Sequence, residues 1–270
     1  MSVSPCEEKL STVEQSHSSV KQPNEYQVTR LRDSRSFSHR LVEAFPVDGV
    51  KKDDRRPFFR MDCSFKIPEE DPASFVARMP KVPPVERVQD FHSFLDSINQ
   101  NSLADVPRAR IKQFLEFEES YPVEIKFCEP EYVVGLRPNP TGRLHAWMRI
   151  KETPTVDLHP YRDAILTYFS DALLIWVSLT EPLPVYYLVT LNQSIWFHNP
   201  HSCPEPDEWL LFETRSNFVG GALTLSYGAM WNKEGDLLAS MAQQGLVRTQ
   251  QMTPVSSSNS LEEKKVSNSH

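Results

Sequence analysis

The sequence predicts an α+β protein in which antiparallel sheets wrap around a central helix. Three observations lead to this fold class. Four strand-like segments separated by turns follow one another in the last third of the chain. They are preceded by one long segment, residues 161–178, which is apolar almost all round and is typical of a helix buried in its domain. Three alternating segments near the beginning predict a separate meander.

We expect order to begin near Tyr26. Residues 1–25 are rich in Ser, Glu, Gln and Lys, cannot bury enough apolar surface to offset the entropy of ordering, and are predicted to be a disordered tail. The strands of the meander are predicted at residues 27–33, 37–47 and 57–67. A sheet of three strands needs a helix or a second sheet over its apolar face.

Residues 80–122 are predicted to be a linker with short helices. Pro80, Pro83 and Pro84 exclude regular structure at its start. Helices are expected at residues 88–98 and 109–118, where they either pack on the meander or leave its apolar face to another chain.

The second half of the chain is specified more fully by its pattern. Strands are predicted on both sides of the long apolar helix, and residues 250–270 repeat the composition of the first tail and are predicted to be disordered. The predicted strands are residues 123–129, 144–151, 185–196, 208–214, 222–231 and 237–248.

Composition and charge exclude several classes of protein. A net charge of −7 argues against nucleic acid as the main partner, because phosphate binding needs a basic surface. No stretch approaches the roughly 18 apolar residues that a membrane helix needs. The four cysteines lie far apart without metal-ligand spacing, so we expect reduced thiols, no metal and no cofactor. Without a secretory signal or an SKL-type C-terminus, the default location is the cytoplasm.

Two predicted strands carry polar side chains that a core would not select for packing alone. They are residues 190–198 (TLNQSIWFH) and 238–245 (LASMAQQG). Trp196, Phe197 and Trp209 are interpreted as core aromatics, with substrate contact as the alternative, and His198 as a hydrogen-bonded structural residue, with a catalytic base as the alternative. A buried amide such as that of Gln243 needs a partner, which indicates a functional site.

These strands closely resemble the C-terminal half of type II acyl-CoA thioesterases, a family with two hotdog folds in tandem. The resemblance covers about residues 27–249. Its strongest part is QSIWFH at 193–198, EWLL at 208–211, LAS at 238–240 and QQG at 243–245. Weaker matches include Arg32-Asp33, residues 59–65, 145–150 and 168–171. It implies a double hotdog, with a partial N-terminal hotdog at residues 26–79 and a C-terminal hotdog at 123–249.

The resemblance also implies a set of site residues. In the family, a carboxylate, a Ser or Thr hydroxyl and a Gln hold the water that attacks the thioester. The carboxylate position reads Asn192 here and the His after it reads Gln193, the hydroxyl falls at Ser216 or its neighbour Asn217, and the Gln is retained as Gln243. The candidate catalytic residues are thus Asn192, Ser216 and Gln243, and the candidate substrate-binding residues are Asp171, Gln193 and Asn217.

Loss of the carboxylate has a chemical consequence. A neutral amide orients water but cannot take its proton, and general-base catalysis contributes about 10²–10⁴-fold. The amides of Asn192 and Gln243 are able to donate to a developing oxyanion, an effect of about 10²–10³. Asp171 is a substitute base if it faces the same pocket. If Ser216 and Gln243 face Asn192, then Asn192→Asp is predicted to raise hydrolysis.

The family's first hotdog begins with a strand and a helix that have no counterpart in residues 1–25. Three explanations remain open: a truncated gene model, a sheet covered by the connecting helices, or a chain that folds only as a homo-oligomer. The charged run 51–56 (KKDDRR) is interpreted as a solvated loop, with contact to coenzyme A phosphates as the alternative.

The expected function is hydrolysis of an acyl thioester, bound to coenzyme A or to a carrier, in a specialised biosynthetic pathway. The alternatives are a scaffold that binds acyl groups without cleaving them, or dehydration or isomerisation. The family resemblance also allows a peroxisomal location.

Overall fold

The computed structural model describes residues 24–47, 56–69, 73, 75–151, 157–181, 183–198, 205 and 208–249. Residues 1–23 of the first predicted tail, the whole second tail and most of the charged loop at 51–56 lie outside these residues, whereas Asn24 and Glu25 already belong to a strand. The chain divides into two compact units, Met1–Ser74 and Phe75–His270, and each is described by itself. Among the described residues, no helix combines the length and apolar character needed to span a membrane.

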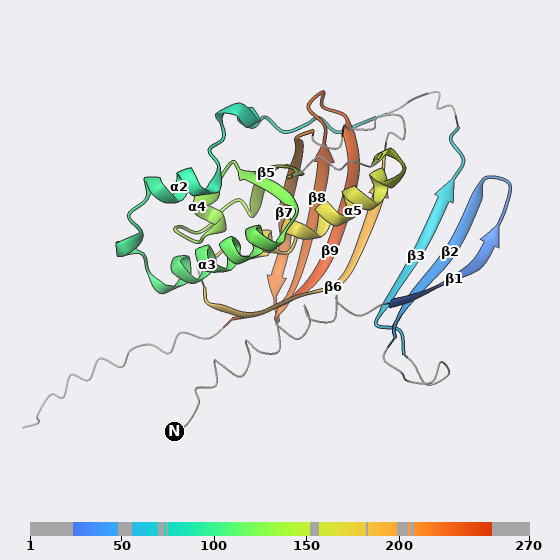
Figure 1. Cartoon of the computed structure of the whole chain (residues 1–270), viewed down its shortest axis with the longest axis horizontal. Helices are drawn as coiled ribbons and strands as arrows, with labels where there is room; N and C mark the ends of the chain where they lie inside the picture. The colour runs from blue at the N-terminus through green and yellow to red at the C-terminus, as the bar shows by residue number, and fades with distance from the viewer. Residues whose placement is uncertain are drawn as a thin grey trace, which may run out of the picture. The chain divides into compact units, whose positions relative to one another are not determined.

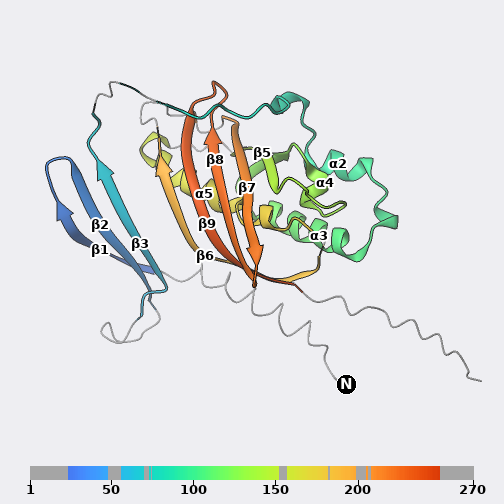
Figure 2. The ribbon, with the colours of Figure 1, turned by 180° about the vertical axis from the view of Figure 1, so that it is seen from behind.

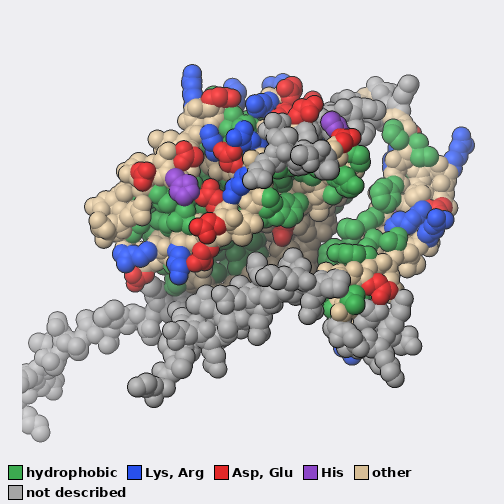
Figure 3. Space-filling view, in the orientation of Figure 1, with side chains coloured by type: hydrophobic (Ala, Val, Ile, Leu, Met, Phe, Trp, Pro, Cys, Tyr) green, Lys and Arg blue, Asp and Glu red, His purple; other side chains and the backbone are tan. Residues whose placement is uncertain are grey.

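The first unit contains the predicted meander. Strands β1 (Asn24–Asp33), β2 (Phe37–Pro46) and β3 (Phe59–Lys66) form an antiparallel sheet in the order β1-β2-β3 (Figure 1). The pairing places Tyr26, Ala44 and Phe59 on one face, and the next two pairs add Val28 and Met61. Tyr26 and Val28 are each 63% exposed, and hydrophobic side chains gather over this sheet in Figure 3. Large apolar side chains on this face are therefore exposed within the first unit, although Ala44 between them is buried.

The second unit is built on a six-stranded antiparallel sheet in the order β4-β5-β7-β8-β9-β6. Its last strand in space, β6, precedes β7 in sequence, because the chain crosses the sheet through a helix between β5 and β6 (Figures 1 and 2). The strands are β4 (Val123–Phe127), β5 (Arg143–Ile150), β6 (Val185–Phe197), β7 (Leu210–Gly220), β8 (Leu223–Trp231) and β9 (Leu237–Thr249).

The crossing helix, α5 (Arg162–Leu173), lies against one face of this sheet (Figure 1), which we call the inner face. Short 3₁₀ turns precede and follow it at His159–Tyr161 (η5) and Trp176–Ser178 (η6). Leu166, Phe169 and Leu173 are buried in the main core. The prediction of a helix buried on all sides is wrong, because Tyr168 is 46% exposed and Asp171 lies on the same exposed side. The sheet covers only one side of the helix.

Helices α2 (Phe91–Ser97) and α3 (Asp105–Ser120) occupy the segment predicted as a linker. Their apolar side chains enter the same core as α5: Phe91 and Phe114 are 4.4 Å apart between ring centroids, and Phe114 lies 5.0 Å from Phe127 of β4. These side chains are therefore part of the core of the second unit. Shorter helical pieces are η3 (Val85–Arg87), η4 (Gln100–Ser102) and α4 (Pro130–Val133).

The outer face of the six-stranded sheet is partly covered by the segment around η3. A second cluster joins Val85 and Val88 to Trp147, Trp209, Leu211 and Trp231. Trp209 is only 8% exposed, as predicted for a core aromatic. The same prediction is wrong for Trp196 and Phe197, which are 54% and 41% exposed, because both residues lie at the end of β6, the edge strand of the sheet.

Candidate functional site

Four polar side chains lie next to one another across the inner face. The strand pairing aligns Gln193 of β6 with Gln243 of β9, Gln243 with Ser226 of β8, and Ser226 with Ser216 of β7. Paired residues of neighbouring antiparallel strands point to the same side of a sheet. We call Gln193, Gln243, Ser226 and Ser216 the polar row; Thr224 lies two residues from Ser226 on the same face.

The helix α5 completes a hydrogen-bond network with this row. Gln243 Nε2 donates to Asp171 Oδ1 at 2.6 Å and to Gln193 Oε1 at 3.4 Å. Gln193 Nε2 donates to Ser170 Oγ at 2.6 Å. Thr190 Oγ1 donates to Asp171 Oδ1 at 3.2 Å. Asp171 is exposed and Gln243 is only 1% exposed, so the network joins a solvent-accessible carboxylate to a buried amide.

The carboxylate fixes the orientation of the buried amide. An ionised carboxylate only accepts hydrogen bonds, so the side of Gln243 that faces Asp171 must be the NH₂ group. Both N–H groups of Gln243 are therefore engaged, by Asp171 and by Gln193. The free atom of this side chain is its acceptor Oε1, and Gln243 is not available as an oxyanion donor in this arrangement.

Four buried polar atoms near this point have no hydrogen-bond partner among the described residues: Gln243 Oε1, Ser226 Oγ, Ser216 Oγ and Thr224 Oγ1. Ser226 is 0% exposed and Thr224 1%. A buried polar group without a partner costs about 1–3 kcal/mol, and native structures contain few of them. Their concentration on one face of three adjacent strands indicates a site that interacts with a ligand or with water.

The structure does not bring Asn192 to this site. Its Nδ2 donates to Gln244 Oε1 at 2.9 Å, and the pairing of Asn192 with Gln244 places both side chains on the outer face. The register shifts at Leu191, between Thr190 and Asn192. Without this bulge, pairing from Thr190 would place Asn192 opposite Gln243. The condition under which Asn192→Asp was expected to raise hydrolysis is therefore not met.

A second bulge separates the two alternatives for the hydroxyl position. The pairing of β7 with β8 shifts between Ser216 and Phe218, at Asn217. Ser216 lies in the polar row with its hydroxyl buried, whereas Asn217 is exposed. Of the six residues named from the sequence, the structure thus brings together Asp171 and Gln193 with Gln243, and aligns Ser216 with them across the sheet.

Sequence reasoning missed Ser226, Ser170 and Thr190. The available signal for Ser226 was a small polar residue on the same side of its strand as the buried, apolar Met230, and Thr224 gives the same signal. Ser170 sits in the buried face of α5, where the same kind of signal applies. The role of Thr190 depends on the bulge at Leu191, which no local pattern predicts.

Tyr121 lies beside Asp171 and remains a neutral phenol. Burial raises the pKa of Tyr121, and the neighbouring Tyr168 and Asp171 raise it further. Its hydroxyl donates to the carbonyl oxygen of Tyr168 at 2.9 Å, and the two rings stack with centroids 4.8 Å apart. Tyr121 therefore supports the exposed side of α5 and is not a proton acceptor at neutral pH.

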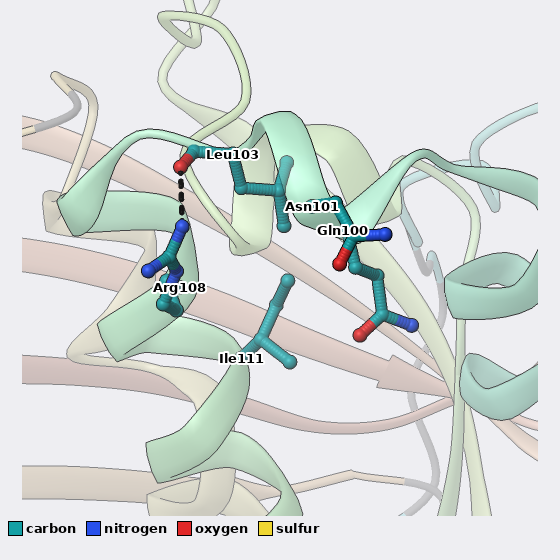
Figure 4. Close-up of a pocket in the computed structure, with 5 residues that line it drawn as sticks. All are labelled: Gln100, Asn101, Leu103, Arg108 and Ile111. Carbon is teal, nitrogen blue, oxygen red and sulfur yellow. Dashed lines mark hydrogen bonds between the residues drawn. The ribbon is translucent and has the colours of Figure 1, made fainter.

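A separate pocket of about 400 Å³ lies at the corner between η4 and α3 (Figure 4). It is lined by Gln100, Asn101, Leu103, Arg108 and Ile111. Arg108 turns away to donate to the carbonyl oxygen of Leu103 at 3.0 Å. None of the polar-row residues lines this pocket. Within the described ranges, no group of three His, Cys, Asp or Glu side chains is placed to hold a metal ion.

Comparison with known proteins identifies the fold and the family. Residues 102–247 match the model of the acyl-CoA thioesterase C-terminal domain. Human acyl-coenzyme A thioesterase 8 is 29% identical over 238 residues, which cover 84% of this chain and 69% of the human protein. Acyl-CoA thioesterase 2 of Haemophilus influenzae is 25% identical over 229 residues, which cover 83% of this chain and 73% of that protein.

Solved structures agree on the fold. The acyl-CoA thioesterase II TesB2 of Mycobacterium marinum superposes with a TM-score of 0.59 at 23% identity, covering 84% of this chain and 74% of that one. A hot dog fold protein of unknown function from Alicyclobacillus acidocaldarius gives a TM-score of 0.56 at 19% identity, with coverages of 83% and 72%. The α+β double-hotdog prediction is confirmed. Because the family model spans more than half of the chain, this protein belongs to the type II acyl-CoA thioesterases.

Proposed function

We propose that this protein hydrolyses an acyl thioester, carried by coenzyme A or by a carrier protein, to a free acid and a thiol on the inner face of its six-stranded sheet. The observation that carries the proposal is the 2.6 Å hydrogen bond from the buried Gln243 amide to Asp171. This hydrogen bond supports Asp171 as the carboxylate of the reaction, in place of the neutral Asn192 at the position where the family has a carboxylate.

Asp171 acts as the general base. Its Oδ1 accepts hydrogen bonds from Gln243 and Thr190, while its Oδ2 has no partner among the described residues. Oδ2 takes a proton from water as the water oxygen attacks the thioester carbonyl carbon. When the tetrahedral intermediate collapses, the carbon–sulfur bond breaks, and the protonated Asp171 returns the proton to the departing thiolate. The atoms balance as acid plus thiol.

Gln193 supplies hydrogen bonding to the oxyanion. One N–H of its Nε2 donates to Ser170 Oγ, and the second has no acceptor within the described part of the chain. The side chain is half-buried on the edge strand β6, where a substrate is able to reach it. A single preorganised donor of this kind contributes about 10²–10³-fold to turnover.

The test is thiol release from short, medium, long and branched acyl-CoA esters and one carrier-bound ester. Gln243→Ala removes the amide that holds Asp171, and we expect turnover to fall by at least about 10²-fold, because a displaced base no longer reaches the attacking water. Gln244→Ala is the matched control, because the next residue on the same strand faces the outer side and its loss leaves the inner network intact. Equal activity of the two variants would refute the assignment of the inner face.

A second candidate function is acyl binding without hydrolysis. It is favoured by one observation, that the family's carboxylate position holds Asn192 on the outer face. In that case no ester releases thiol, while calorimetric titration still shows saturable binding of acyl-CoA. Dehydration or isomerisation would instead appear as a changed acyl-CoA product with its thioester intact. A homo-oligomer, a cytoplasmic location and a specialised pathway remain predictions.

A further inference from the structure

We propose that the unpaired polar atoms around Ser226 recognise a hydroxyl group on the acyl chain, so that the preferred substrates are hydroxyacyl thioesters. This inference rests on the proposed function. It assigns Ser226 as a specificity-determining residue that contacts the acyl group, beside the residues that carry out hydrolysis.

The position of Ser226 separates recognition from chemistry. It lies one strand away from Gln243 and one strand from Ser216, and neighbouring strands are about 4.8 Å apart. The reacting carbonyl is placed at the Asp171 end of the row, because that end is exposed. A group that binds at Ser226 therefore lies only a few bonds from the reacting carbonyl carbon. A hydroxyl two carbons from that carbonyl fits this distance.

The unpaired atoms specify the kind of group that binds. Gln243 Oε1 accepts only, and the hydrogen bond from its Nε2 to Asp171 prevents the amide from turning over. It therefore requires a donor. Ser226 Oγ is able to accept or donate, and both atoms are buried without a partner in the part of the chain that the structure describes. A hydroxyl satisfies the two atoms together, whereas a keto oxygen leaves Gln243 Oε1 unpaired and a methylene leaves both.

The inward side chains toward the other end of β8 and β9 are apolar and do not bind a substrate hydroxyl. Toward the other end of β8 and β9 the inward positions are Met230, Ala239 and Met241, all essentially buried. These side chains are packed in the main core and offer no hydrogen-bond donor, and an unsubstituted acyl chain leaves the atoms of the polar row unpaired. Sites that hydrogen-bond a substrate hydroxyl discriminate strongly against analogues that lack it, because their own polar groups are then left unpaired.

The test compares three coenzyme A esters of equal chain length: unsubstituted, 3-oxo and 3-hydroxy. We measure kcat/KM for the natural protein, for Ser226→Ala and for Thr214→Val. Thr214 is the matched control, because it is buried on the same face but its hydroxyl already donates to the carbonyl oxygen of Leu144 at 3.3 Å. We expect the natural protein and Thr214→Val to prefer the 3-hydroxy ester by at least about 10²-fold.

Ser226→Ala is expected to reduce that preference about tenfold, by lowering kcat/KM for the 3-hydroxy ester alone. Its melting temperature should stay the same or rise, because the substitution removes a buried hydroxyl for which the described residues provide no partner. This combination of lost selectivity and retained stability does not follow from a structural role of Ser226.

Other outcomes overturn the inference and leave the proposed function standing. Equal turnover of the three esters by the natural protein shows that no hydroxyl is recognised. If Ser226→Ala lowers kcat/KM equally for all three esters, the Ser226 hydroxyl binds water or contributes to packing and does not recognise the substrate. If no ester is hydrolysed, the proposed function fails, and calorimetric titration with the same esters decides the inference: tighter binding of the 3-hydroxy ester that is lost in Ser226→Ala supports it, and equal binding refutes it.

Discussion

Replacement of Asp171 by Asn tests the assignment of the general base with the smallest change of shape. The amide keeps an oxygen that is able to accept the hydrogen bonds now made by Gln243 at 2.6 Å and Thr190 at 3.2 Å. It cannot take a proton. Because general-base catalysis contributes about 10²–10⁴-fold, we expect kcat to fall by that factor.

The effect on stability should be small. Hydrogen bonds to a charged group contribute about 1.5–3 kcal/mol and those between neutral groups about 0.5–1.5 kcal/mol. Asp171 is exposed, which screens its charge and favours the lower end of the difference. We therefore expect Asp171→Asn to lower the free energy of unfolding by about 1 kcal/mol, a shift of about 2–4 °C in melting temperature.

The assay combines thiol release under saturating ester with urea unfolding of the same preparations. Asp163→Asn is the control, since Asp163 is an exposed carboxylate on the same helix whose contact is with Arg162 at 2.7 Å. Full turnover of Asp171→Asn would refute the base assignment. A loss of turnover accompanied by a stability loss of several kcal/mol would show that Asp171 supports the fold rather than the chemistry.

Four further predictions follow from individual contacts. Asn192→Asp should leave thioester turnover unchanged, because the side chain faces away from Gln243; thiol release measures this, and an increase would contradict the placement of Asn192. In a chain whose other two cysteines are replaced by Ser, a thiol reagent should label Cys63 before Cys128, because burial raises the pKa of the Cys128 thiol to about 12; mass spectrometry of the labelled peptides decides the order. Burial lowers the pKa of His198 below its usual 6.5. The stability that depends on the neutral imidazole is therefore complete above about pH 6.5 and declines as the pH falls through the lowered pKa. Between pH 7.5 and pH 5.5 the melting temperature of His198→Gln should thus fall less than that of the natural protein. Arg110→Met should lower the free energy of unfolding by about 3 kcal/mol or more in urea, because the buried guanidinium donates to the carbonyl oxygens of Glu181 at 2.7 Å, Leu183 at 3.4 Å and Leu179 at 3.5 Å; an unchanged urea midpoint would show that these bonds contribute nothing.

Local pattern was sufficient to predict the strands and the position of the crossing helix. Alternation locates β6 and β9, and turn residues locate their ends. Local pattern was not sufficient to predict which side chains are exposed to solvent. Trp196 and Phe197 resemble core residues by composition, yet their strand lies at the edge of the sheet. Strand order is a long-range property, and hydrophobicity alone does not reveal which strand lacks a neighbour.

The candidate site was predictable in its residue types more than in its geometry. Gln243 and Asp171 were identifiable because polar groups in an apolar strand or helix need partners. Asn192 was expected beside them because the family resemblance assigns the carboxylate to its position, and a resemblance in sequence does not reveal the bulge at Leu191. Ser226 was not selected, because a single serine in a strand has many explanations until the pairing shows Gln243 on one side of it and Ser216 on the other.

The extra residue at Leu191 has a consequence for how function is transferred between related sequences. An alignment column records position along the chain, whereas the side of the sheet depends on where a strand accommodates one surplus residue. If the surplus fell at Gln193 instead of Leu191, Asn192 would lie opposite Gln243 with no change of sequence. Two homologues with the same residue at the position of Asn192 are thus able to point that residue to opposite faces of the sheet. The position of the bulge therefore decides, together with the residue itself, which group meets the ligand.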